Sequence, residues 1–141
     1  RRLGGAIVAL ATGMRRRDIA RHRADRPAGW HTVEEPLDVP GQVAQVQTDV
    51  LLLDCLSVWV NNLMFHDWTD AQILAATDDL VSAARNHAGT VILVTNEVGM
   101  GVVPDYRSGR LFRDMLGLIN QRIAAACDEV HLVIAGRVIR L

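Results

Sequence analysis

The stretch at residues 49–54 (DVLLLD) decides the fold class. Consecutive aliphatic residues that end at an acid are typical of a parallel strand buried on both faces of a sheet. The runs at residues 6–11 (AIVALA), 90–95 (TVILVT) and 129–135 (EVHLVIA) have the same character. We therefore predict buried strands in all of these stretches.

Segments with helical spacing, or with helix start and stop signals, separate these strands. The predicted helices are residues 15–25, 57–65, 70–87 and 107–127, with Thr69 as the N-cap of the third. Because strands and helices alternate, the sequence predicts an α/β fold with a mostly parallel sheet flanked by helices.

The remaining segments give weaker signals. Residues 30–34 alternate loosely and are predicted to form an edge strand, and residues 137–141 a last strand. Residues 36–47 show no regular pattern of polar and apolar residues, and the pair Pro40-Gly41 indicates a break between elements. At 141 residues, we expect a single domain spanning residues 1–141.

The composition argues against several classes of protein. A formal net charge of -1 gives no case for binding nucleic acid or an anionic membrane. No apolar run reaches the roughly 18–20 residues of a membrane span, and no signal peptide is recognisable, so we expect a cytoplasmic protein. The two cysteines, Cys55 and Cys127, predict neither a disulfide framework nor a zinc site. All 15 basic residues are arginines, so the sequence has no lysine.

Polar residues follow the predicted strands where a parallel sheet usually binds its ligand, beyond the carboxyl ends. These residues are Thr12, Asp54, the pair Asn96-Glu97, and Gly136. Asp54 stands where Walker-B aspartates bind Mg²⁺, directly or through water. The alternative is that Asp54 caps the helix that follows.

His22 lies among Arg21, Arg23 and Arg26. A histidine that attacks a phosphate needs a neutral nitrogen and nearby cations, and nearby arginines lower the pKa of a histidine and so favour the neutral form. The residues alone favour the plainer interpretation, which is a solvated basic helix face.

Two acidic segments also have two interpretations. Glu34 and Glu35 suit an exposed surface, or they could accept hydrogen bonds from a nucleotide. The loop at residues 96–101 (NEVGMG) could approach a ligand closely, with Glu97 holding Mg²⁺ or acting as a base. The alternative for this loop is a tight structural connection.

Together these segments resemble the adenosylcobinamide kinase/adenosylcobinamide-phosphate guanylyltransferase family. The resemblance rests on residues 19–36 (IARHRADRPAGWHTVEEP), 51–65 (LLLDCLSVWVNNLMF) and 91–141, in the same order and at familiar spacing. The segments HRADRPAGW and NEVGMGVVP are the most specific. The resemblance implies a P-loop NTPase-like (RecA-like) three-layer sandwich.

The resemblance also implies roles for individual residues. His22 matches the histidine that GTP guanylylates, and Asp54 matches the Walker-B-like acid, with Mg²⁺ expected there. The residues that match nucleotide-lining positions are Ala11, Thr12, Arg23, Ala24, Asp25, Arg26 and Glu34. Asn96 and Glu97 match the loop after the next strand, where a catalytic or metal role for Glu97 follows from position.

The implied chemistry has two steps. ATP or GTP first phosphorylates the aminopropanol hydroxyl of adenosylcobinamide. GMP then moves from GTP to His22, and from His22 to the new phosphate, giving adenosylcobinamide-GDP.

The sequence departs from the family at its beginning. The family starts with a strand and a phosphate loop of the form GGxxSGKS, which a lysine-free sequence does not contain. The stretch at Met14-Arg15 also looks several residues shorter than in the family. We expect the chain to belong to a longer protein that carries this loop.

Two other hypotheses remain open. One is an inactive nucleotide-fold subunit without a phosphate loop, and the other is a guanylyltransferase that lacks kinase activity. The resemblance also suggests a homo-oligomer, as a trimer. An apolar cluster suits either a subunit contact or, more commonly, a core helix; its residues are Val58, Trp59, Leu63, Met64 and Phe65.

Overall fold

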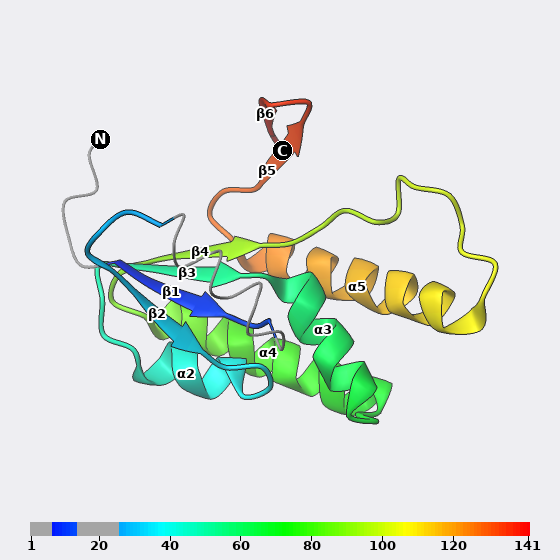
Figure 1. The fold of residues 1–141 in the computed structure, drawn as a ribbon, viewed down its shortest axis with the longest axis horizontal. Helices are drawn as coiled ribbons and strands as arrows, with labels where there is room; N and C mark the ends of the chain where they lie inside the picture. Colours follow the sequence, from blue (N-terminus) through cyan, green and yellow to red (C-terminus); the bar gives the residue numbers. More distant parts are fainter. Residues whose placement is uncertain (1–6, 14–25) are drawn as a thin grey trace.

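The computed structural model describes residues 7–13 and 26–141, and within them a parallel sheet forms the centre (Figure 1). Its strands are β1 (Ile7–Ala11), β2 (Trp30–Glu34), β3 (Val50–Asp54) and β4 (Thr90–Val94), in the order β2-β1-β3-β4. Every neighbouring pair is parallel. The predicted α/β class and the edge position of β2 are thus confirmed, whereas the helix predicted at residues 15–25 lies outside the described residues.

Helices pack on one face of this sheet. They are α2 (Val39–Gln45), α3 (Leu56–Phe65), α4 (Asp70–Asn86) and α5 (Arg107–Ala126). Because side chains alternate along a strand, Leu10, Leu51 and Leu53 point to this face and are fully buried. They join a core with the buried residues of the helices, among them Val43, Trp59, Leu63, Leu80, Leu116 and Ile119.

The helix α2 lies in the segment that seemed interrupted by proline and glycine. Pro40 occupies the first turn, where its missing N–H costs no helical hydrogen bond. The Asp38 side chain accepts a hydrogen bond from the Gly41 amide at 3.1 Å and so caps the helix. A Cβ at Gly41 would lie 2.3 Å from a carboxylate oxygen of Asp38, so a larger residue would displace the capping carboxylate. The pair Pro40-Gly41, which indicated a break in the sequence, therefore lies in the first turn of α2.

Helix α4 begins as predicted. Thr69 is its N-cap, and Thr69 and Gln72 form a reciprocal capping box. Asp70 in the first turn and Arg85 in the last turn complement the helix dipole.

Two strands predicted to be buried are not. Ile92 and Val94 of β4, at the edge of the sheet, are each 40% exposed. Strand β5 (His131–Ile134) pairs antiparallel with β6 (Arg137–Arg140) in a hairpin that stands apart from the main sheet in Figure 1. An apolar run identifies a strand but does not show which neighbour covers it, and here the prediction of burial was wrong.

The hairpin also changes the position of Gly136. Ala135 and Gly136 both have positive φ, at 49° and 73°, as the two-residue turns of hairpins require. Gly136 therefore forms the hairpin turn and does not lie at the carboxyl edge of the parallel sheet, as the sequence had indicated.

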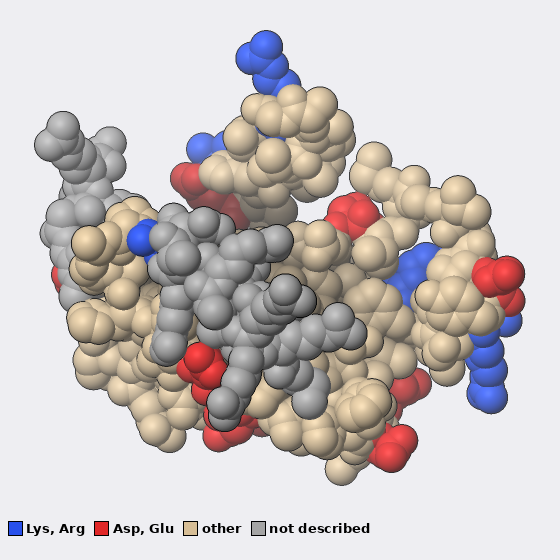
Figure 2. Space-filling view, in the orientation of Figure 1, with Lys and Arg blue, Asp and Glu red and all other residues tan. Residues whose placement is uncertain are grey.

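Charges and cysteines on the described surface are dispersed. Figure 2 shows arginine and acidic side chains scattered over the visible face, with no large area of one sign among the described residues. Cys55 and Cys127 are both free. Burial and the Asp128 carboxylate raise the pKa of the Cys127 thiol, against the opposing effect of Arg85.

Over the described residues, no helix is long and apolar enough to span a membrane.

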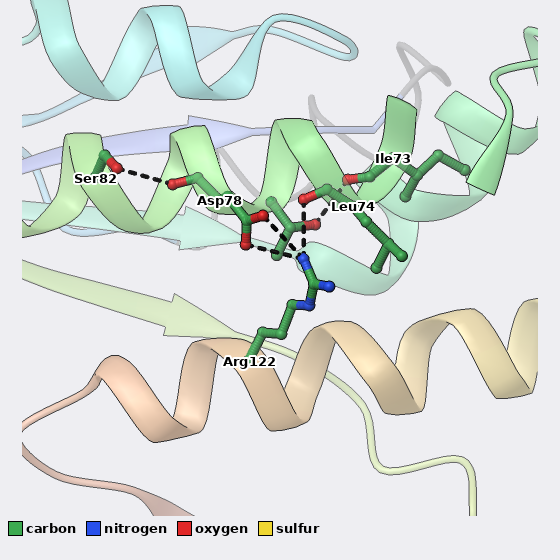
Figure 3. Close-up of polar contacts among 6 residues, drawn as sticks. Ile73, Leu74, Asp78, Ser82 and Arg122 are labelled. Carbon is green, nitrogen blue, oxygen red and sulfur yellow. Dashed lines mark hydrogen bonds and ion pairs between the residues drawn. The ribbon is translucent and has the colours of Figure 1, made fainter. Parts of the chain in front are cut away.

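An ion pair links α4 to α5 (Figure 3). One guanidinium nitrogen of Arg122 lies 3.0 and 2.9 Å from the two carboxylate oxygens of Asp78. Both side chains are substantially exposed, at 43% and 64%, and exposed ion pairs add little stability because water and salt screen them. Leu116, on the same α5, is fully buried in the core.

We expect Arg122→Ala to lower the free energy of unfolding by less than about 1 kcal/mol. Leu116→Ala should lower it by about 2–5 kcal/mol, because it removes a buried side chain and leaves a cavity. Urea denaturation of both variants tests the contrast. Equal losses would show that the ion pair is stronger than its exposure suggests.

Candidate functional site

The carboxyl ends of the four parallel strands meet along one edge of the sheet. The register aligns Ala11 with both Glu34 and Asp54, and Asp54 with Val94. The connections after these residues therefore start side by side, in the position where parallel α/β sheets bind ligands.

Asp54 ends β3 beside an arginine. A guanidinium nitrogen of Arg26 lies 3.4 Å from Oδ2 of Asp54, and another donates to the Thr32 hydroxyl at 3.0 Å. The side chain of Arg26 is 11% exposed and that of Asp54 is 31% exposed, so the pair is only partly screened by water. Asp54 is not the N-cap of α3, because Cys55 holds that position. The capping alternative for Asp54 is therefore wrong.

Thr12 has its hydroxyl fully engaged in the protein. It accepts a hydrogen bond from the Cys55 amide at 3.0 Å and donates one to the Cys55 carbonyl at 2.9 Å. Thr12 is completely buried and Ala11 nearly so. The Thr12 side chain therefore joins the connections after β1 and β3.

The two adjacent glutamates behave differently. Glu35 accepts hydrogen bonds from the amides of Leu37 and Asp38, at 2.9 and 2.8 Å, and so forms the turn into α2. Glu34 ends β2 at the edge of the sheet and is exposed. Of the two glutamates, Glu34 lies at the end of β2 and Glu35 belongs to the turn that follows it.

The loop after β4 is held from two helices. Ser57 of α3 donates to the Asn96 side-chain oxygen, and Asn120 of α5 donates to the Asn96 carbonyl at 3.1 Å. The exposed Glu97 accepts a hydrogen bond from the Gly99 amide at 2.7 Å. A Cβ at Gly99 would lie 2.8 Å from Oε1 of Glu97, so the glycine allows this close turn.

Several predicted site residues cannot be compared with this geometry. His22, Arg23, Ala24 and Asp25 lie outside the described residues. The structure brings together Ala11, Thr12, Arg26, Glu34, Asp54 and Asn96 at the carboxyl edge.

Other polar residues at this edge were missed from sequence. Ser57 and Asn62 of α3 are buried, and Asn120 of α5 also accepts from the Thr95 hydroxyl at 2.8 Å. The available signal was a polar residue within an apolar helical stripe, such as Asn62 in VNNLMF.

A shallow hollow lies at the opposite end of the sheet. It has a volume of about 350 Å³ and is lined by Gln47, Thr48, Asp49, Ala88 and Gly89, near the amino ends of β3 and β4. Ligands of parallel α/β sheets bind beyond the carboxyl ends, so we favour the edge that carries Asp54.

Known proteins resemble this chain over most of its length. A family model described as cobinamide kinase / cobinamide phosphate guanyltransferase matches residues 6–141. The bifunctional adenosylcobalamin biosynthesis protein CobU of Salmonella typhimurium is 42% identical over 132 residues, which cover 84% of this chain and 73% of that protein. CobU of Escherichia coli is 39% identical over the same shares of each chain. The bifunctional adenosylcobalamin biosynthesis protein CobP of Pseudomonas aeruginosa is 39% identical over 94% of this chain and 80% of its own.

Proposed function

Because this chain belongs to the cobinamide kinase / cobinamide phosphate guanyltransferase family, we propose that it is a bifunctional transferase of cobalamin biosynthesis. It phosphorylates adenosylcobinamide and then converts the phosphate to adenosylcobinamide-GDP. The observation that carries the proposal is the family match over residues 6–141. The polar residues gathered at the carboxyl edge of the sheet support it.

The first reaction is a phosphoryl transfer. The aminopropanol hydroxyl oxygen of adenosylcobinamide attacks the γ-phosphorus of ATP or GTP. A new P–O bond forms, the hydroxyl proton is released to solvent, the bond to the bridging oxygen breaks, and the nucleoside diphosphate leaves with that oxygen. Such reactions depend mainly on positioning and on stabilising the phosphoryl charge.

The second reaction passes through His22. One imidazole nitrogen attacks the α-phosphorus of GTP, a P–N bond forms and pyrophosphate leaves. An oxygen of adenosylcobinamide phosphate then attacks the same phosphorus and breaks the P–N bond. The products are adenosylcobinamide-GDP and free His22. Arg23 and Arg26 follow His22 in the sequence, and their proposed role is to stabilise the phosphate charge.

Asp54 suits a cation that arrives with the nucleotide. Mg²⁺ is commonly held by one or two carboxylates together with substrate phosphates, and Asp54 offers one carboxylate at the sheet edge. Among the described residues, no group of three or more His, Cys, Asp and Glu side chains is arranged to hold a metal ion. The proposed role of Asp54 is therefore to hold Mg²⁺ jointly with the nucleotide, where the ion would neutralise phosphate charge.

Product analysis tests the proposal. The protein is incubated with Mg²⁺ and GTP, and with adenosylcobinamide or its phosphate as acceptor, and the products are separated by mass. We expect adenosylcobinamide-GDP from both acceptors. If adenosylcobinamide-GDP forms only from adenosylcobinamide phosphate, the protein is a guanylyltransferase without kinase activity. If neither acceptor gives this product, the protein is an inactive subunit.

We also propose a single nucleotide-binding domain that assembles as a homo-oligomer, a trimer, in the cytoplasm. Trp59 and Leu63 of α3 are buried in the core, which leaves Val58 and Phe65 exposed, the latter at 74%. These exposed apolar side chains would suit a subunit contact. Light scattering of the purified protein measures the number of subunits.

A further inference from the structure

Asn62 connects two of the loops at the carboxyl edge of the sheet. It lies in α3 and is 1% exposed. Its amide nitrogen donates to the Thr12 carbonyl at 2.8 Å and to the Pro36 carbonyl at 3.0 Å. A side-chain amide has two N–H donors, so both are used.

The two carbonyls lie at defined places in the fold. Thr12 is the first residue after β1, and Pro36 follows β2 by two residues. The Thr12 hydroxyl also binds the backbone of Cys55, the first residue after β3. Asn62 and Thr12 together therefore fix the connections after three neighbouring strands, β1, β2 and β3, relative to one another.

These connections carry the residues of the proposed guanylyl transfer. The chain runs from Thr12 into the segment that contains His22, and Pro36 follows Glu34 closely in sequence. Because Asn62 is buried behind the loops, it can act on the reaction only through them.

We propose that Asn62 is a positioning residue for guanylyl transfer, an inference that rests on the proposed function. By holding the Thr12 and Pro36 carbonyls, it fixes the connections after β1 and β2 relative to each other, at the edge where Glu34 and Asp54 lie. Small displacements of a reacting group slow a reaction strongly, and a shift of about 1 Å can cost about 100-fold in rate.

The test compares two neighbouring asparagines of α3. Asn62→Ala removes both hydrogen bonds, and Asn61→Ala makes the same change at an exposed position of the same helix. The formation of guanylyl-enzyme from α-labelled GTP is followed at several GTP concentrations. We expect Asn62→Ala to lower the rate at saturating GTP by about 10- to 100-fold, with the KM for GTP within about threefold. Asn61→Ala should match the unsubstituted protein.

A second pair of variants separates positioning from loss of stability. Asn62→Ser is a milder change that keeps a hydroxyl donor, and it decides the test if Asn62→Ala does not fold. Leu80→Ala weakens the core in α4, away from these loops. If Leu80→Ala lowers both the melting temperature and the labelling rate as much as the Asn62 variants do, Asn62 has only a structural role.

The outcomes for the inference and for the proposed function differ. Folded Asn62 variants that label at the rate of the unsubstituted protein would overturn the positioning role. A lack of labelling in the unsubstituted protein would instead overturn the guanylyl-transfer proposal itself.

Discussion

Replacing His22 with alanine is expected to abolish the labelling of this protein by α-labelled GTP. The imidazole nitrogen is the proposed nucleophile, and alanine offers no atom that could form the P–N bond. Loss of a covalent nucleophile lowers turnover by several orders of magnitude in other enzymes, so we expect a loss of at least about 1,000-fold. Labelling is measured on the denatured protein, and the phosphoramidate should be lost in acid and retained in base.

The matched control for this experiment is His131→Ala. His131 lies in the β5–β6 hairpin, apart from the parallel sheet, and its ring is partly exposed beside Glu129. This variant should label like the unsubstituted protein. A label that persists in His22→Ala, or that survives acid, would assign the nucleophile to another residue.

The parallel sheet could be predicted from sequence because its strands are short aliphatic runs between polar residues. The runs that became β1 and β3 are interior strands, as expected. The run that became β5 looked equally apolar, yet among the described strands it pairs with β6 alone. The hydrophobicity of a strand indicates that it prefers burial. Which strands lie beside it depends on contacts between residues that are distant in sequence.

The helix α2 was missed for a local reason. A Pro-Gly pair usually indicates a turn, and here both residues belong to the first helical turn because the Asp38 carboxylate caps it. The capping acid lies only three residues before Gly41, so this signal was present in the sequence.

The candidate site was predictable in its position and not in its contacts. Asp54 and Asn96 could be assigned to strand ends from sequence alone. The Arg26–Asp54 pair spans 28 residues, and the bond from Asn62 to Thr12 spans 50. No short-range pattern encodes such pairs, which appear only when the sheet brings the strand ends together.

Replacing Asp54 with asparagine should have the second large effect. Asparagine keeps the size of the side chain and removes the negative charge that would attract Mg²⁺ at the end of β3. Mutation of a group that only supports a metal ligand lowers metal affinity or activity by about 10- to 100-fold. Loss of a direct ligand should therefore lower the rate of adenosylcobinamide phosphorylation by about 100-fold or more. Binding of Mn²⁺ together with the nucleotide, followed by electron paramagnetic resonance, should weaken in parallel.

Two further variants decide how Asp54 acts. Asp79→Asn makes the same change on the exposed face of α4 and should leave both measurements unchanged. Arg26→Gln removes one charged neighbour of Asp54 and keeps the carboxylate. If Asp54→Asn leaves Mn²⁺ binding intact, Asp54 is not a metal ligand. Both variants break the pair between Arg26 and Asp54, but only Arg26→Gln keeps the carboxylate of Asp54. If Asp54→Asn weakens Mn²⁺ binding and Arg26→Gln does not, the carboxylate therefore acts on the cation.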